Sequence, residues 1–200
     1  MTVPDPIKQW RKQQRAELLV RRMAAPLAVR RQWNEAITAR LLQGFPQLLG
    51  SVLGIFWPIK GEFDPRFALR RLRESGTRAA LPVVLRQAAP LEFRAWWLGV
   101  ATIRGVYDLP VPCATGVLRP DVLLIPPVGF DALGYRLGYG GGFYDRTLAA
   151  LSPQPLKIGV GFELSRIATI RPQAHDVAMD CIVTEQGTYR VGRNSLERAD

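Results

Sequence analysis

Residues 121–125 read Asp-Val-Leu-Leu-Ile, a short and almost wholly apolar run that lies between Pro120 and Pro126. Runs of this length and composition are typical of a central parallel strand that helices cover on both faces. The run therefore predicts the middle of an α/β sheet. Further strands are predicted before and after it in the chain, at residues 51–57, 78–85, 91–98, 157–162 and 181–184.

Helical patterns alternate with these strands. Such alternation predicts an α/β fold, a Rossmann-like three-layer sandwich with a mostly parallel open sheet and helices on both faces. Ligands of such sheets bind beyond the carboxyl ends of the strands, where residues 126–146 would lie. The apolar spacing and the flanking Pro and Gly residues predict helices over residues 6–24, 27–43, 64–76 and 143–151, and a proline-rich surface loop over 108–120.

The composition is that of an ordinary globular protein, with 200 residues of which 48% are hydrophobic and 22% charged. A chain of this length fits one core, and no long linker divides it, so residues 1–200 are expected to form a single domain. The sequence contains no apolar run long enough to span a membrane, and its first residues lack the apolar stretch of a secretory signal. Two cysteines are too few for a disulfide framework, so we expect a cytoplasmic protein. We also expect a monomer.

The formal net charge is +10, and much of it lies near the N-terminus, where residues 1–40 hold nine Lys or Arg against three Asp or Glu. A basic region of this kind attracts polyanions, which include nucleic acids, anionic membranes and nucleotide phosphates. The sequence shows no helix-turn-helix, zinc finger or RNA-recognition motif. A basic nucleic-acid-binding protein is therefore the less favoured interpretation, and we expect neither a nucleic-acid nor a membrane partner.

A glycine-rich segment supplies the candidate chemistry. Residues 136–146 read Arg-Leu-Gly-Tyr-Gly-Gly-Gly-Phe-Tyr-Asp-Arg. Glycines let backbone N–H groups approach phosphate oxygens, and the helix that begins near Phe143 would direct its positive end at them. Arg136 adds a bidentate cation and Asp145 a carboxylate for Mg²⁺. The segment lacks the Gly-Lys-Ser/Thr ending of a Walker loop and the third glycine of a dinucleotide fingerprint. A merely flexible glycine loop is the alternative.

Together with Asp121, Pro126, Phe130, Asp131 and Gly134, this segment resembles the signature of the 5-formyltetrahydrofolate cyclo-ligase (methenyltetrahydrofolate synthetase) family. The resemblance implies an ATP-dependent ligase of one-carbon metabolism, with Asp145 as a magnesium ligand. It implies that Arg136, Tyr144 and Asp145 are catalytic. It also implies ATP binding by Arg136, Gly138, Tyr139, Gly140, Gly141, Gly142, Phe143 and Tyr144, and that Tyr139 through Phe143 also face the folate.

Three weaker markers accompany the glycine-rich segment. Arg11 and Arg15 stand four residues apart on one predicted helix face, and the resemblance implies that both reach the nucleotide phosphates. Trp57 and Glu62 follow the first predicted strand and are implied to bind the folate, while Asp176 is implied to be a second magnesium-side carboxylate. Taken without the resemblance, these residues read as a solvated basic helix face, a core tryptophan and a solvated carboxylate.

The implied reaction converts 5-formyltetrahydrofolate and ATP to 5,10-methenyltetrahydrofolate, ADP and phosphate. The formyl oxygen is first phosphorylated and N10 then attacks the activated carbon, so the protein mainly positions groups and neutralises charge. Arg11 stands where the family usually has Lys, and Phe143 where Tyr is common. These departures leave a second interpretation open, in which a divergent ATP-using relative acts on another formyl or amide substrate.

Overall fold

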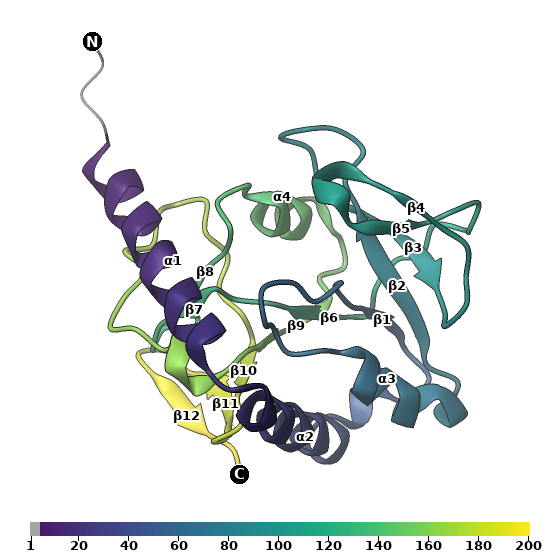
Figure 1. The fold of residues 1–200 in the computed structure, drawn as a ribbon, viewed down its shortest axis with the longest axis horizontal. Coiled ribbons are helices and arrows are strands. Elements are labelled where there is room, and N and C mark those ends of the chain that lie inside the picture. Colours follow the sequence, from purple (N-terminus) through teal and green to yellow (C-terminus); the bar gives the residue numbers. More distant parts are fainter. Residues whose placement is uncertain (1–4) are drawn as a thin grey trace.

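The computed structural model describes residues 5–200 and contains an eight-stranded sheet in the order β12-β11-β10-β9-β6-β1-β2-β3 (Figure 1). Two small two-stranded sheets, β4-β5 and β7-β8, accompany it. The strands are β1 (Val52–Gly54), β2 (Arg78–Val83), β3 (Glu92–Trp96), β4 (Thr102–Arg104), β5 (Pro110–Pro112), β6 (Val122–Ile125), β7 (Gly129–Phe130), β8 (Arg136–Leu137), β9 (Leu156–Val160), β10 (Cys181–Val183), β11 (Thr188–Val191) and β12 (Leu196–Arg198).

The five strands in the middle of the sheet are parallel and follow the order β2-β1-β6-β9-β10. All four residues of β6 are buried, and β6 pairs with β1 on one side and β9 on the other. The prediction that residues 121–125 form a central parallel strand is confirmed. Strand order reverses between β1 and β6, the switch point at which ligands of doubly wound sheets bind.

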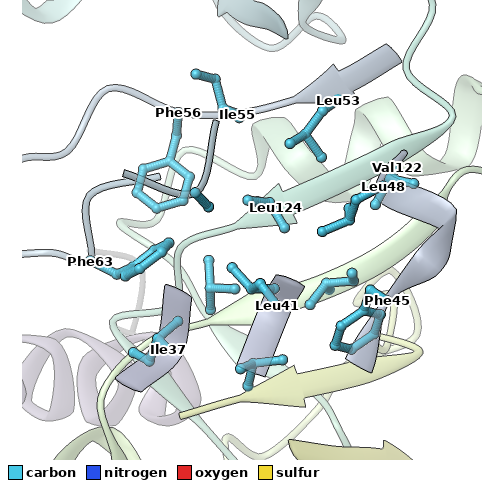
Figure 2. Packing of buried hydrophobic residues seen from close by; sticks show 14 of the residues in the cluster. Ile37, Leu41, Phe45, Leu48, Leu53, Ile55, Phe56, Phe63, Val122 and Leu124 are labelled. Carbon is cyan, nitrogen blue, oxygen red and sulfur yellow. The ribbon is translucent and has the colours of Figure 1, made fainter. Parts of the chain in front are cut away.

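Helices cover both faces of the sheet, as predicted (Figure 1). On one face Ile37 and Leu41 of α2, together with Phe45 just after it, pack against Leu53 and Leu124 of the strands (Figure 2). Leu72 of α3 belongs to the same cluster. On the other face Leu148 of α4 packs in a second apolar cluster, together with Leu123 and Ile125 of β6. The helices are α1 (Pro6–Ala24), α2 (Leu27–Gly44), α3 (Arg66–Leu72) and α4 (Phe143–Ala150), with short 3-10 turns η1 (Pro46–Leu48), η2 (Arg73–Ser75), η3 (Val106–Asp108) and η4 (Glu163–Ser165).

Helix α1 does not cover the central strands. Its Leu18 packs in a third cluster with Val128, Leu137 and Ile170, so α1 lies against the β7-β8 hairpin. A Cβ atom at residue 129 would lie 2.6 Å from Cδ1 of Leu18, so the hairpin approaches the helix at a distance that suits glycine. This packing brings one face of α1 next to the glycine-rich segment.

The structure differs from the expectations at the edges of the sheet. Residues 91–98 form a strand, but β3 is antiparallel to β2. The expected surface loop over 108–120 contains β5, which pairs with β4. The antiparallel strands β11 and β12 at the other edge were not predicted. None of the helices within residues 5–200 has the length and hydrophobicity that a membrane span requires.

Candidate active site

A cavity of about 530 Å³ lies at the switch point of the sheet. Phe56 and Trp57, which follow β1, and Pro126, which follows β6, form part of its wall. The glycine-rich segment and two arginines of α1 form another part. A volume of this size is typical of a small-molecule site, so the cavity is the candidate active site.

Every residue that sequence reasoning assigned to the site lines this one cavity. They come from α1, from the loop after β1, from the glycine-rich segment and from the loop before β10. They are Arg11, Arg15, Trp57, Glu62, Arg136, Gly138, Tyr139, Gly140, Gly141, Gly142, Phe143, Tyr144, Asp145 and Asp176.

The glycine-rich segment turns sharply before α4. Gly140 and Gly142 have φ angles of 99° and 64°, in the left-handed region that favours glycine, and Gly142 immediately precedes the helix. Arg15 of α1 donates from Nε to the carbonyl oxygen of Gly138 at 2.7 Å. Within the described chain, no hydrogen bond is found for its two terminal nitrogens. The loop and Arg15 thus present N–H donors of the kind that bind phosphate.

Arg136 and Asp145, at the two ends of the glycine-rich segment, form an ion pair. Nη2 of Arg136 lies 2.8 Å from Oδ1 of Asp145, which also accepts from the backbone N–H of Val177 at 3.1 Å. Both bonds use the same carboxylate oxygen. Among the described residues, no hydrogen bond is found for Oδ2 of Asp145, so this oxygen has a free face for a further ligand.

Arg11 and Asp176 form the second ion pair at the cavity. Asp176 accepts from the guanidinium of Arg11 on both oxygens and from the backbone N–H of Gln173 at 2.6 Å. Arg11 also donates to the carbonyl oxygens of Ile170 and Arg171, at 3.1 and 2.9 Å. In this geometry Arg11 is bound to Asp176, and both side chains line the cavity, so the phosphate role of Arg11 and the metal role of Asp176 stay predictions.

The carboxylate oxygens that are available as ligands decide which residue fits Mg²⁺. Within residues 5–200, no group of three or more His, Cys, Asp or Glu side chains is suited to hold a metal. Mg²⁺ is usually held by one or two carboxylates together with substrate phosphates and water. Oδ2 of Asp145 beside the glycine-rich loop fits this pattern. Oδ2 of Asp176 fits it less well, because this oxygen already accepts from both Arg11 and Gln173.

Glu62 is a buried carboxylate in the cavity wall, with its side chain 3% exposed. Its Oε1 accepts from the hydroxyl of Tyr139 at 2.7 Å and its Oε2 from the backbone N–H of Ile59 at 2.9 Å. Burial raises the pKa of Glu62 above its usual range, although these hydrogen bonds and nearby cations oppose the shift. Burial, and next the charge of Glu62, raises the pKa of Tyr144, which therefore keeps its proton at neutral pH.

Trp57 combines core packing with a place at the cavity. Its ring meets Trp96 edge-on at 6.4 Å between centroids, and the guanidinium of Arg66 lies 4.6 Å from its centroid. The ring therefore belongs in part to the core, which was the plainer interpretation of a strand-end tryptophan. It still lines the cavity, so a folate contact stays a prediction.

Among the neighbours of the site that sequence reasoning missed are Tyr107, Lys60 and Arg22. Tyr107 lines the cavity and meets Phe143 edge-on at 6.1 Å, from a backbone with φ of 64° that no local sequence signal announces. Lys60 also lines it, with Nζ 5.5 Å from the ring centroid of Tyr139. Arg22 of α1 bonds to Tyr139 at 2.7 Å. Its helical spacing from Arg15 was the signal that could have revealed it.

The fold and the cavity together define the class of protein. It is a doubly wound α/β protein with a glycine-rich, arginine-lined cavity at the switch point of its sheet. The chain belongs to the 5-formyltetrahydrofolate cyclo-ligase family, whose model matches residues 7–185. The predicted family and fold are thereby confirmed.

Individual relatives agree with this assignment. The 5-formyltetrahydrofolate cyclo-ligase of Mycolicibacterium smegmatis is 35% identical over 182 residues, which cover 86% of this chain and 92% of the relative. The enzyme of the same name from Escherichia coli is 27% identical over 173 residues, or 82% and 94% of the two chains. The solved structure of a 5,10-methenyltetrahydrofolate synthetase from Aquifex aeolicus is similar with a TM-score of 0.79 and 26% identity, covering 94% of this chain and 97% of that one.

Proposed function

We propose that this protein is an ATP-dependent enzyme that converts 5-formyltetrahydrofolate to 5,10-methenyltetrahydrofolate and releases ADP and phosphate. Membership of the cyclo-ligase family supports this activity. The observation that carries the proposal is one cavity that brings Arg15 and the glycine-rich loop together with the buried carboxylate Glu62. Such a cavity offers donors to a triphosphate and an acceptor to a pterin.

The residues have separate tasks in this proposal. Backbone N–H groups of residues 138–142 and the terminal nitrogens of Arg15 bind the phosphates of ATP. Mg²⁺, held by Asp145 and the phosphates, would neutralise charge on the transferred group. Glu62 accepts hydrogen bonds from the N–H groups of the pterin, and Trp57 packs against an aromatic part of the folate.

The bonds change in two steps. The formyl oxygen attacks the γ-phosphorus, the bond from that phosphorus to the bridging oxygen breaks, and ADP leaves. N10 then attacks the activated formyl carbon and loses its proton, and the carbon–oxygen bond breaks as phosphate departs. Arg136 and the neutral hydroxyl of Tyr144 stabilise the negative charge of the transferred group. No residue is assigned as the general base.

A cytoplasmic location and a monomeric state complete the proposal. Nucleic acid is not a proposed partner. Size-exclusion chromatography with light scattering tests the monomer, and titration with DNA at low and high salt tests the basic surface.

An absorbance assay tests the activity. Purified protein is incubated with 5-formyltetrahydrofolate, Mg²⁺ and ATP, and the methenyl absorbance is followed in time. We expect the absorbance to grow with ATP and to stay flat without it. A flat trace from folded protein that still binds ATP contradicts the proposed substrate and favours a relative that acts on another formyl or amide compound.

A further inference from the structure

Arg22 is a buried cation on the helix that carries Arg11 and Arg15. Leu18 and Arg22 are the buried residues of α1, and Arg22 is 3% exposed. Positions 11, 15, 18 and 22 follow one another at helical spacing, so they share the face of α1 that meets the rest of the protein. Burial of an arginine is unfavourable unless its donors are satisfied, so its partners reveal its task.

The guanidinium of Arg22 joins three segments of the cavity wall. Nε donates to the carbonyl oxygen of Lys60 at 3.0 Å, in the loop after β1. Nη1 donates to the carbonyl oxygen of Pro127 at 3.3 Å, in the loop after β6. Nη2 donates to the hydroxyl of Tyr139 at 2.7 Å, in the glycine-rich segment. One side chain thus fixes the two strand-end loops and the glycine-rich segment relative to α1.

The same network ends on the carboxylate of Glu62. Tyr139 accepts from Arg22 and donates its own proton to Oε1 of Glu62 at 2.7 Å. Nη2 of Arg22 also lies 3.6 Å from that oxygen, and the two side chains are 4% and 3% exposed. A buried ion pair that loses one partner leaves an uncompensated charge, so Arg22 favours the ionised form of Glu62.

The charges around Glu62 come from several elements. Arg22 of α1 and Lys60 of the same loop are cations, whereas Tyr139 and Tyr144 are phenols whose pKa values are raised, chiefly by burial. Burial raises the pKa of Glu62, and the N–H of Ile59, the hydroxyl of Tyr139, Arg22 and Lys60 lower it in that order. Arg22 therefore acts on Glu62 both by its charge and by holding Tyr139 in place.

We propose that Arg22 is a positioning residue that orients Tyr139 and Glu62 and keeps Glu62 as the carboxylate which receives the N–H groups of the folate pterin. The identity of that ligand rests on the proposed function, whereas the network itself does not. Arg22 acts through Glu62 and Tyr139 and is not among the residues that line the cavity.

Kinetics of three variants test the proposal. Arg22→Gln removes the charge, Arg22→Lys keeps it without the planar fork, and Arg21→Gln removes an equal charge from an exposed neighbouring position. Loss of hydrogen bonds to a charged group predicts an increase of KM for the folate by about tenfold to a hundredfold in Arg22→Gln, with KM for ATP changed less than about twofold. Arg21→Gln should match the wild type.

The pH profile separates positioning from general destabilisation. Without Arg22 the pKa of Glu62 rises further, so the pH below which kcat/KM for the folate declines should move upward in Arg22→Gln. In Arg22→Lys the acid limb of the kcat/KM profile should return toward its wild-type position, while KM for the folate stays raised. Equal pH limbs in the wild type and in both Arg22 variants, all of them folded by circular dichroism, would overturn the proposal.

A measurement made without substrate tests the Arg22–Tyr139–Glu62 network independently of the proposed function. Carbon NMR follows the titration of the glutamate carboxyls, and Glu62→Gln identifies the signal of Glu62 by its disappearance. We expect that signal to titrate at higher pH in Arg22→Gln than in the wild type or Arg21→Gln. If the wild type fails to form the methenyl product while the signal still shifts, the proposed function is wrong and the network stands. An unshifted signal overturns the network whatever the activity.

Discussion

Arg136 and Asp145 both form hydrogen bonds with the backbone of Val177. Nη1 of Arg136 donates to the carbonyl oxygen of Val177 at 2.7 Å, and the N–H of the same residue donates to Oδ1 of Asp145 at 3.1 Å. The two side chains are themselves paired at 2.8 Å. This arrangement fixes the loop before β10 against the start of α4, and it leaves Oδ2 of Asp145 as the oxygen for a metal.

The first prediction concerns that oxygen. Asp145→Asn retains an acceptor for Arg136 and Val177 but removes the negative charge that Mg²⁺ requires. We expect kcat to fall by at least about a hundredfold, as for the loss of one strong electrostatic group at a reacting centre, with little change in melting temperature. The absorbance assay and thermal denaturation measure the two effects.

Asp180→Asn is the matched control for this change. Asp180 pairs with Lys157 at 2.8 Å and is not among the residues that line the cavity. Its variant should keep the wild-type kcat at every Mg²⁺ concentration. A wild-type rate in Asp145→Asn would remove Asp145 from the site.

The second prediction separates two cations of α1. Arg15 faces the glycine-rich loop, whereas Lys12 is exposed. Arg15→Ala should raise KM for ATP by about tenfold to a hundredfold, because charge-assisted hydrogen bonds to phosphate are lost, and Lys12→Ala should change it little. Isothermal titration of ATP into each variant measures the affinity directly. Equal affinities would show that Arg15 has no phosphate contact.

Local signals in the sequence predicted the centre of the fold and the glycine-rich wall of the cavity, whereas the other residues that line the cavity were assigned through the family resemblance. An apolar run between prolines marked β6, and glycines before a helix marked the loop at residues 138–142. The edges were harder, since β5 is a three-residue strand with Pro110 and Pro112 at its ends. Prolines lack the N–H that a strand normally donates, so the sequence resembles a loop.

Side-chain pairing was beyond sequence reasoning for a different reason. Arg11 and Asp176 lie 165 positions apart in the chain and meet only because α1 packs on the β7-β8 hairpin. Both residues were assigned to the site, but as independent ligands of phosphate and metal. The signal for Arg22, its helical spacing from Arg15, was present in the sequence, yet only the fold shows that this helix face is buried.

The third prediction is a pH dependence of folate binding. Burial raises the pKa of Glu62, so its ionised form is lost as the pH falls through a value above that of an ordinary glutamate, about 4.3. The kcat/KM for the folate should therefore decline on the acid side before kcat/KM for ATP does. In Glu62→Gln this acid limb should disappear, and Glu62→Ala should raise KM for the folate more than KM for ATP. The opposite ranking would show that the pterin lies elsewhere.

The fourth prediction concerns stability and the Arg11–Asp176 pair. Burial by itself raises the pKa of Asp176, but hydrogen bonds from Arg11 and the N–H of Gln173, together with the charges of Arg11 and His175, produce a net lowering. A carboxyl whose pKa is lower in the folded than in the unfolded state stabilises the fold above the unfolded value, about 3.9. That stabilisation is lost as the pH falls through the folded value.

Asp176→Asn should therefore lower the free energy of unfolding at pH 7 by about 1–2 kcal/mol, the usual effect of losing hydrogen bonds between charged groups. For a chain of this length the loss corresponds to a decrease in Tm of about 2–8 °C. The difference from the wild type should shrink as the pH falls below the unfolded value and through the lowered pKa of the folded Asp176, since the carboxyl then gains a proton and loses its charge. Thermal denaturation from pH 2 to pH 8 measures it, with Arg11→Gln and the double variant closing the cycle. A difference that stays constant over this range would mean that the carboxylate charge of Asp176 does not stabilise the fold. The bond between Asp176 and Arg11 would then not help to hold α1 against the rest of the protein.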